Sequence, residues 1–187
     1  MYIKNKDRKR IEKIAEALLN KFGIRHARNS LDGICAKLGI EVIRAKQEDD
    51  VCFMICMGGQ SSSTKIYLDN RTDEFSQKTH LGRALGHIVL NHNSMFVKDR
   101  YMNQDADTLN QVKKTEARYF KQCILLPTNE LVHTLRQGVT AGLQGENLLC
   151  GVAKHLDVSR DFVKRRVDME EIKLPAPKPA PTGPRHG

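Results

Sequence analysis

The sequence lacks several features that would assign it to a familiar class. It has no tryptophan, and aromatic residues make up only 5% of its 187 residues. Its longest apolar run, Val51–Met57, is far shorter than the roughly 18 residues that a membrane-spanning helix needs. The first residues, Met1–Lys13, are charged and contain no apolar segment of the kind found in secretory signals. We therefore expect no membrane span and no secretion, and we predict a cytoplasmic protein.

Closely paired cysteines are also missing. None of the five cysteines belongs to a C-x-x-C pair, so the sequence predicts neither a zinc knuckle nor a redox-active dithiol. Free thiols without a secretory signal are typical of proteins in the reducing cytoplasm. The five residues are Cys35, Cys52, Cys56, Cys123 and Cys150.

What the sequence does contain is typical of a folded protein with a basic surface. Hydrophobic residues make up 40% and charged residues 28% of the chain, which excludes general disorder. The formal charge of +9 is concentrated in Lys4–Lys13, Lys154–Arg166 and residues 173–187. A basic balance of this size fits nucleic acid, an anionic surface or an acidic protein partner, but also a solvated surface with no particular partner.

The spacing of apolar residues predicts helices on both sides of a group of short strands. Ser30 is expected to cap the second helix. The order of elements predicts an α+β fold with a small antiparallel sheet. Helices are predicted over residues 8–22, 30–39, 75–92, 108–125, 130–136, 147–155 and 160–167, and strands over 40–42, 51–57 and 65–68.

Three parts of the chain are predicted from changes in composition. Pro127 is expected to end the long helix before it, so we place a first domain at residues 1–127. A helical module follows at 128–172. Five of the six prolines fall in residues 173–187, which have no core residues to bury, so we expect a disordered basic tail there.

The candidate site lies in the predicted helix over residues 75–92. Zinc peptidase helices contain H-E-x-x-H, in which two histidines one turn apart bind one ion and the glutamate acts as the base. Here His87 stands at the second histidine, Arg83 stands at the first, and Ala84 stands at the glutamate. Taken by itself, a single histidine on a helix is more often structural than functional.

A segment further along the chain favours a metal-site interpretation of His87. The segment from Glu116 to Pro127, EARYFKQCILLP, resembles the E-A-x-x-F-A-x-x-L-L-M-P segment of the ImmA/IrrE family of metallopeptidases. Residues 11–42, 65–69 and 148–172 are similar to other blocks of that family, in the same order. The resemblance covers roughly residues 8–172. It implies a zincin-like fold in which zinc is the cofactor and Glu116 is the third zinc ligand.

The departures from this family fall on the chemistry. A catalytic zinc needs three protein ligands and an activated water. Arg83 places a permanent cation at a ligand position, and Ala84 removes the base. We therefore expect no catalytic residue and no cofactor, with His87 and Glu116 left from a vestigial metal site. We also expect Arg83 to fill the metal position and pair with Glu116, beside His87, and His92 to point away from this face.

Two residues are alternatives for rescuing a metal site. His80 lies on the same helix face as His87, but two turns or about 10 Å away. Cys123 follows Glu116 by seven residues and is a possible soft ligand, although a buried helix cysteine is more often part of the core. If either joined His87 and Glu116, the chain would bind zinc.

The segment over residues 147–167 is similar to a helix-turn-helix. Ser159 is expected to cap its second helix, which carries the basic residues Arg160, Lys164, Arg165 and Arg166. A recognition helix needs such an exposed basic face. The alternative is a packing module with a solvated basic face, and the related peptidases carry a similar region.

These observations lead to one expected function and two alternatives. Proteins of the ImmA/IrrE type cut helix-turn-helix repressors, often on phages and mobile elements. We expect a pseudoprotease that still binds such a repressor and regulates transcription as an antirepressor would. The first alternative is an active zinc metallopeptidase with a rearranged site that cleaves the repressor. The second is a regulator that binds DNA directly through its C-terminal module.

Overall fold

The structure is a computed structural model, and it describes residues 3–27, 30–58, 63–92, 96–100 and 108–174. The chain divides into two compact units, Met1–Pro127 and Thr128–Gly187, which are described separately here. The predicted disordered tail lies outside the described residues from residue 175 onward. No helix among the described residues is long and apolar enough to cross a membrane.

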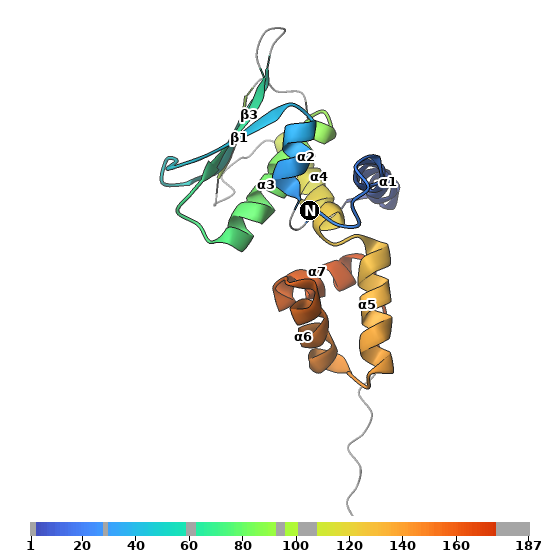
Figure 1. Ribbon diagram of the computed structural model, residues 1–187. Helices are drawn as coiled ribbons and strands as arrows, with labels where there is room; N and C mark the ends of the chain where they lie inside the picture. The colour runs from blue at the N-terminus through green and yellow to red at the C-terminus, as the bar shows by residue number, and fades with distance from the viewer. Residues whose placement is uncertain (1–2, 28–29, 59–62, 93–95, 101–107, 175–187) are drawn as a thin grey trace, which may run out of the picture. The chain divides into compact units, whose positions relative to one another are not determined.

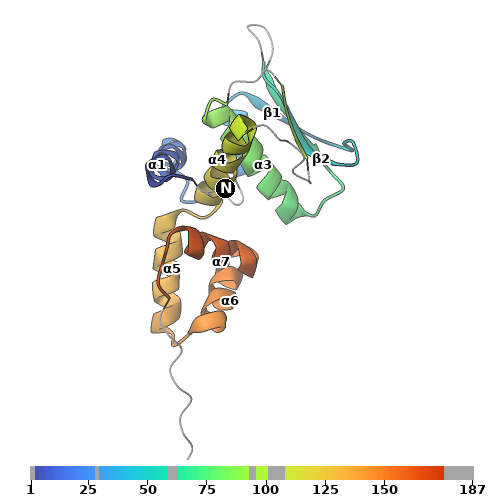
Figure 2. The same ribbon diagram turned by 180° about the vertical axis from the view of Figure 1, so that it is seen from behind.

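The first unit is a layered α+β structure, as predicted. A mixed sheet forms one layer, and α3 packs between this sheet and α4, while α1 lies on α4 (Figures 1 and 2). Its described elements are α1 (Asn5–Lys21), α2 (Leu31–Lys37), β1 (Ile40–Ala45), β2 (Val51–Cys56), β3 (Thr64–Asp69), α3 (Glu74–Val89), β4 (Phe96–Arg100) and α4 (Thr108–Leu125).

The prediction of an antiparallel sheet is wrong for one of its strand pairs. The strand order is β1-β3-β2-β4, and β1 pairs with β3 in parallel, while β2 is antiparallel to both β3 and β4. The short connection from β1 to β2 therefore passes across the end of β3, which lies between them. Sequence periodicity reports which face of a strand is buried but not which strand lies beside it.

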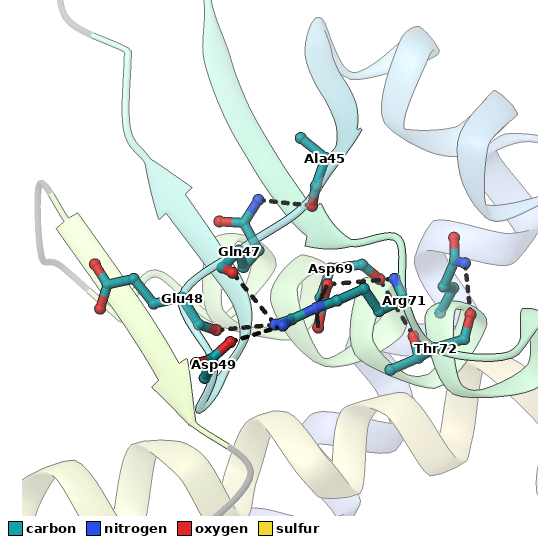
Figure 3. Close-up of polar contacts among 8 residues, drawn as sticks. Ala45, Gln47, Glu48, Asp49, Asp69, Arg71 and Thr72 are labelled. Atoms are coloured by element: carbon teal, nitrogen blue, oxygen red, sulfur yellow. Dashed lines mark hydrogen bonds and ion pairs between the residues drawn. The ribbon is translucent and has the colours of Figure 1, made fainter.

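Arg71 holds this crossing connection in place (Figure 3). Its Nε donates to Asp69 at 2.9 Å, and its Nη1 donates to Asp49 at 2.9 Å. Its Nη2 donates to the backbone carbonyls of Gln47 and Glu48 at 3.2 and 3.1 Å. One planar guanidinium thus ties the end of β3 to the loop between β1 and β2, a task for which a single ammonium group has too few fixed donors.

The close approach of α3 to α4 positions the candidate site. Asp73 caps α3 by accepting a hydrogen bond from the backbone N–H of Ser76 at 2.9 Å. A Cβ at Gly86 would lie 3.0 Å from the carbonyl oxygen of Ala117 and 3.1 Å from the Phe120 ring. The missing side chain at Gly86 therefore lets α3 and α4 touch at Gly86 and Ala117. His87 follows Gly86 and Glu116 precedes Ala117, so this contact brings His87 and Glu116 near each other.

Several other sequence predictions have clear outcomes. All the predicted helices are present, with ends that differ by at most four residues. Ser159 caps the last of them by accepting from the N–H of Phe162 at 3.2 Å. Ser30 precedes α2 but makes no side-chain capping bond, so that prediction is wrong. Strand β4 was not predicted, because it is a short strand in which the charged residues Lys98 and Asp99 follow one another.

The described part of the second unit consists of α5 (Thr128–Thr140), α6 (Gly145–Leu156) and α7 (Arg160–Met169). Helix α6 packs against both α5 and α7. Three residues join α6 to α7, and the first of them, Asp157, has a left-handed backbone with φ of 51°. The buried side chains include Leu131, Leu135, Leu148, Val152, Phe162 and Val163.

The start of α1 offers a test of local stability. Lys4 occupies the N-cap with extended backbone angles, and its side chain makes no capping bond. An aspartate at this position would accept a backbone N–H and place a negative charge at the positive end of the helix dipole. We expect Lys4→Asp to raise the free energy of unfolding by about 1 kcal/mol, measured by urea denaturation. Lys4→Ala, which adds no acceptor, serves as the control and should gain less.

Candidate functional site

A buried chain of polar contacts links α3 to α4. His87 and His92 are 5% and 8% exposed, and their Nδ1 atoms are 3.1 Å apart. The Nε2 of His92 lies 3.0 Å from Oε2 of Glu116. On the far side of this carboxylate, Arg10 of α1 donates to Oε1 at 2.5 Å. Sequence reasoning placed His87 and Glu116 together, but it missed both His92 and Arg10.

The prediction that His92 points away from the site is wrong. Helix α3 ends at Val89, and Asn91 then adopts a left-handed backbone with φ of 54°. This turn reverses the chain, so that the backbone N–H of His92 donates to the carbonyl of His87 at 3.0 Å. Asparagine tolerates this conformation better than most residues and is common just after helices. Asn91 was therefore the sequence signal that could have located His92.

The contacts of His92 indicate which ring nitrogens of the two histidines carry a proton. Burial is the main cause that lowers the pKa of His92, against the raising effect of Glu116, and this favours a neutral ring with one proton. The Glu116 carboxylate requires that proton on Nε2, which leaves Nδ1 of His92 to accept from His87. The second nitrogen of His87, Nε2, is then an acceptor. It is buried and has no hydrogen-bond partner among the described residues.

This burial predicts a dependence of stability on pH. Burial, followed by the nearby His92 and Arg83, lowers the pKa of His87 from 6.5 to about 3. Below pH 6.5 the unfolded chain binds a proton at this residue while the folded chain does not. Stability is therefore complete above pH 6.5 and falls as the pH is lowered toward 3, by several kcal/mol in total. Urea denaturation at pH 7.5, 6.5, 5.5 and 4.5 measures this loss.

Two variants isolate the contribution of His87 to that loss. His87→Gln removes the titrating ring, so the urea concentration at the midpoint of its unfolding should change less with pH than that of the unmodified protein. His155→Gln changes an exposed histidine and should reproduce the original profile. An unchanged profile in His87→Gln would show that the acid sensitivity arises elsewhere.

Arg83 does not pair with Glu116, so that expectation is wrong. Its Nη2 lies 2.5 Å from Oδ2 of Asp99 in β4, and it also donates to Sγ of Cys52 at 2.9 Å. Its guanidinium carbon lies 5.1 Å from the centre of the Phe53 ring. The pairing differs from the prediction because strand β4, which was not predicted, supplies the carboxylate of Asp99 to Arg83. Helix α1 supplies the guanidinium of Arg10 to Glu116.

The carboxylate of Asp99 is the anion at the centre of this second cluster. It is 1% exposed, and Nζ of Lys114 lies 3.7 Å from its Oδ1. Burial raises the pKa of Cys52 to about 11, so Cys52 stays a thiol and donates to the backbone carbonyl of Asp99 at 3.2 Å. The guanidinium of Arg83 is therefore held by a buried carboxylate, a ring face and a sulfur atom.

These residues do not fit a zinc ion. His87 offers one open nitrogen, whereas a catalytic zinc needs three protein ligands. Glu116 is already engaged by Arg10 and His92, and the Arg83 cation lies one turn before His87. Ala84 is fully buried and supplies no base. Among the described residues, no group of three or more His, Cys, Asp or Glu side chains could hold a metal ion, so His80 and Cys123 do not complete a set there.

The basic residues of α7 have different environments. Arg166 was predicted on an exposed face, and this is wrong: it is 0% exposed and bonds to Glu170 and to Thr128, the latter at 2.8 Å. Arg160 pairs with Glu146 and Asp161. Lys164 and Arg165 are exposed, beside the exposed acids Asp161 and Asp168. The exposed face of α7 is therefore of mixed charge.

Comparison of the sequence with models of protein families gave no match, and comparison with curated proteins gave none.

Proposed function

We propose that this protein is a catalytically inactive ImmA/IrrE-like protein that regulates transcription by binding a helix-turn-helix repressor. The single observation that carries the loss of activity is the Arg83–Asp99 ion pair, which occupies the helix face where a first histidine ligand would stand. Ala84 on the next position supplies no base for water activation. Hydrolysis in such a site has neither a metal nor a proton acceptor.

The arrangement of elements supports a zincin-like origin of the first unit. Helix α3 carries His87 beside the sheet, and α4 presents Glu116 to it through His92. In metal sites, a ligand histidine usually gives its second nitrogen to a hydrogen-bonding partner, which fixes the orientation of the ring. His87 has this support at Nδ1 while its Nε2 stays open, so its surroundings match those of a ligand whose metal site has been lost.

The C-terminal unit supports the same family resemblance. Its α6 and α7 are joined by three residues, and this hairpin of helices is similar to the helical region that follows the peptidase core. Direct DNA binding through α7 is the less favoured function, because Arg166 is buried and Arg160 is neutralised. The exposed Lys164 and Arg165 lie beside two acids, so they present little net charge to phosphates.

Without hydrolysis, the protein acts by occupancy. A bound repressor is held away from its operator or from its own dimer partner, and silenced genes are released without proteolysis. The effect is therefore reversible and depends on the concentration of both proteins. An active peptidase would instead release the genes even when fewer peptidase molecules than repressor molecules are present.

The experiment is affinity capture from native cells, followed by reconstitution with the purified regulator that is captured. We expect a helix-turn-helix regulator that forms a stable complex and remains intact during prolonged incubation with zinc. Regulator fragments that disappear when a chelator is added would establish the active peptidase instead. Failure to capture any transcription regulator would overturn the proposed function.

A further inference from the structure

The outer face of α1 carries a row of cations that plays no part in the site described above. Lys6, Lys9 and Lys13 are exposed and lie at steps of three and four residues, so they share one face of the helix. The opposite face buries Ile11 and Ala15 against the rest of the first unit. We call the exposed set of Lys6, Lys9 and Lys13 the α1 basic row.

The ammonium groups of this row are not neutralised within the structure. No ion pair is recorded for Lys6, Lys9 or Lys13 in the part of the chain that is described. The neighbouring charges turn inward instead: Arg10 binds Glu116 at 2.5 Å, and Glu12 accepts from the Tyr119 hydroxyl at 2.8 Å. Of the acids near the row, Glu12 is therefore used for holding α1 on α4, while Glu16 is exposed three residues after Lys13.

Lys6 also opposes the preferences of the helix that carries it, because it is the member of the row that lies in the first turn of α1. The N-terminal end of a helix is the positive end of its dipole, where cations are unfavourable by a few tenths of a kcal/mol each. Only one acid, Asp7, lies in the first turn of α1. Residues that break a local rule without a structural gain are expected at functional surfaces. A bound polyanion would offset this repulsion.

The composition of the face favours a nucleic acid over a folded protein. Protein interfaces have an apolar core and are depleted in lysine, whereas nucleic-acid interfaces are polar and strongly basic. The large exposed apolar residues of the described chain are Val112 and Val139, and neither lies on α1. From Lys6 to Lys13 the helix rises about 10 Å, a length that spans about three phosphates along one DNA strand.

We propose that the α1 basic row binds the phosphate backbone of nucleic acid without sequence preference. Lys6, Lys9 and Lys13 each contact a phosphate, and no base is contacted. This interaction does not rest on the repressor binding proposed above, since it requires only the phosphates of a nucleic acid. It would keep the protein on or near DNA, where a repressor is found.

The test is fluorescence anisotropy of a labelled 20-base-pair duplex across a salt series, with the full chain. The variant Lys6→Gln, Lys9→Gln and Lys13→Gln removes the row and leaves Arg10 to hold Glu116. The matched control, Lys154→Gln, Lys164→Gln and Arg165→Gln, removes the same charge from the second unit. We expect the first variant to bind at least tenfold more weakly at low salt. Its slope of log affinity against log salt should fall by about 2.7, or 0.9 for each lost contact.

Each outcome decides the proposal. The control variant is expected to bind as the unmodified protein does, and the thermal midpoint of the row variant should be unchanged or slightly higher, which excludes unfolding as the cause. A loss confined to the control would transfer DNA binding to the second unit and overturn the proposal. Absent duplex binding by the unmodified protein, or equal binding to poly-glutamate, would overturn it as well.

Discussion

Replacing Asp99 by alanine is expected to lower the free energy of unfolding by about 3–5 kcal/mol, because it leaves a buried cation without its partner. Asp99 is 1% exposed and faces both Arg83 and Lys114. The side chain of Arg83 is only 14% exposed, so water cannot replace the lost carboxylate. Typical domains have 5–15 kcal/mol of stability in total. Urea denaturation at neutral pH measures the difference.

An exposed aspartate provides the matched control. Asp49 also pairs with an arginine, at 2.9 Å from Arg71, but its side chain is 96% exposed. Asp49→Ala should therefore change stability by less than about 1 kcal/mol. Adding Arg83→Met to Asp99→Ala removes the uncompensated charge and should recover part of the loss. A cost of Asp99→Ala that is no larger than that of Asp49→Ala would show that Arg83 is not locked by this pair.

Converting Arg83 to histidine and Ala84 to glutamate is expected to create a zinc site that the unmodified protein is expected to lack. The introduced histidine would lie four residues before His87 on the same helix face, as H-E-x-x-H requires. The Nε2 of His87 is already open. Glu116 would complete a His₂Glu set once it leaves Arg10, and the zinc charge would stand near Asp99 in place of the lost guanidinium.

The measurement is zinc content per chain after equilibration and desalting. We expect about one zinc per chain for the double variant and close to none for the unmodified protein. The matched control, Arg83→Gln with Ala84→Glu, contains the glutamate without the second histidine and should bind little zinc. Adding Glu116→Gln to the double variant should weaken binding strongly. A double variant that stays metal-free would contradict the assignment of Arg83 to a lost ligand position.

The predictable parts of the fold are those encoded within one segment of sequence. The helices followed from the spacing of their apolar residues, and α4 was placed with its observed bounds because Pro127 follows it closely. The pairing of β1 with β3 was not accessible, because it depends on which strands meet in space. The role of Arg71 follows from that topology and leaves no local signal beyond a charged residue after a strand.

The candidate site shows the same limit. His87 and Glu116 were identified from motif positions, but the partners of each charged group come from elements far away in the sequence. Asp99 lies in a strand whose consecutive charged residues give no alternating pattern, and Arg10 lies more than a hundred residues before Glu116. Arg166 was misplaced because a long basic side chain suggests an exposed face, whereas Glu170 and Thr128 satisfy it in the interior.

The protein is proposed to bind a repressor without cutting it. Native mass spectrometry of the purified chain, incubated with zinc and the helix-turn-helix regulator captured from its native cells, tests this claim most directly. We expect a complex whose mass is the sum of two intact chains without zinc. Fragments of the regulator that vanish when a chelator is present, or two chains that never associate, would contradict it.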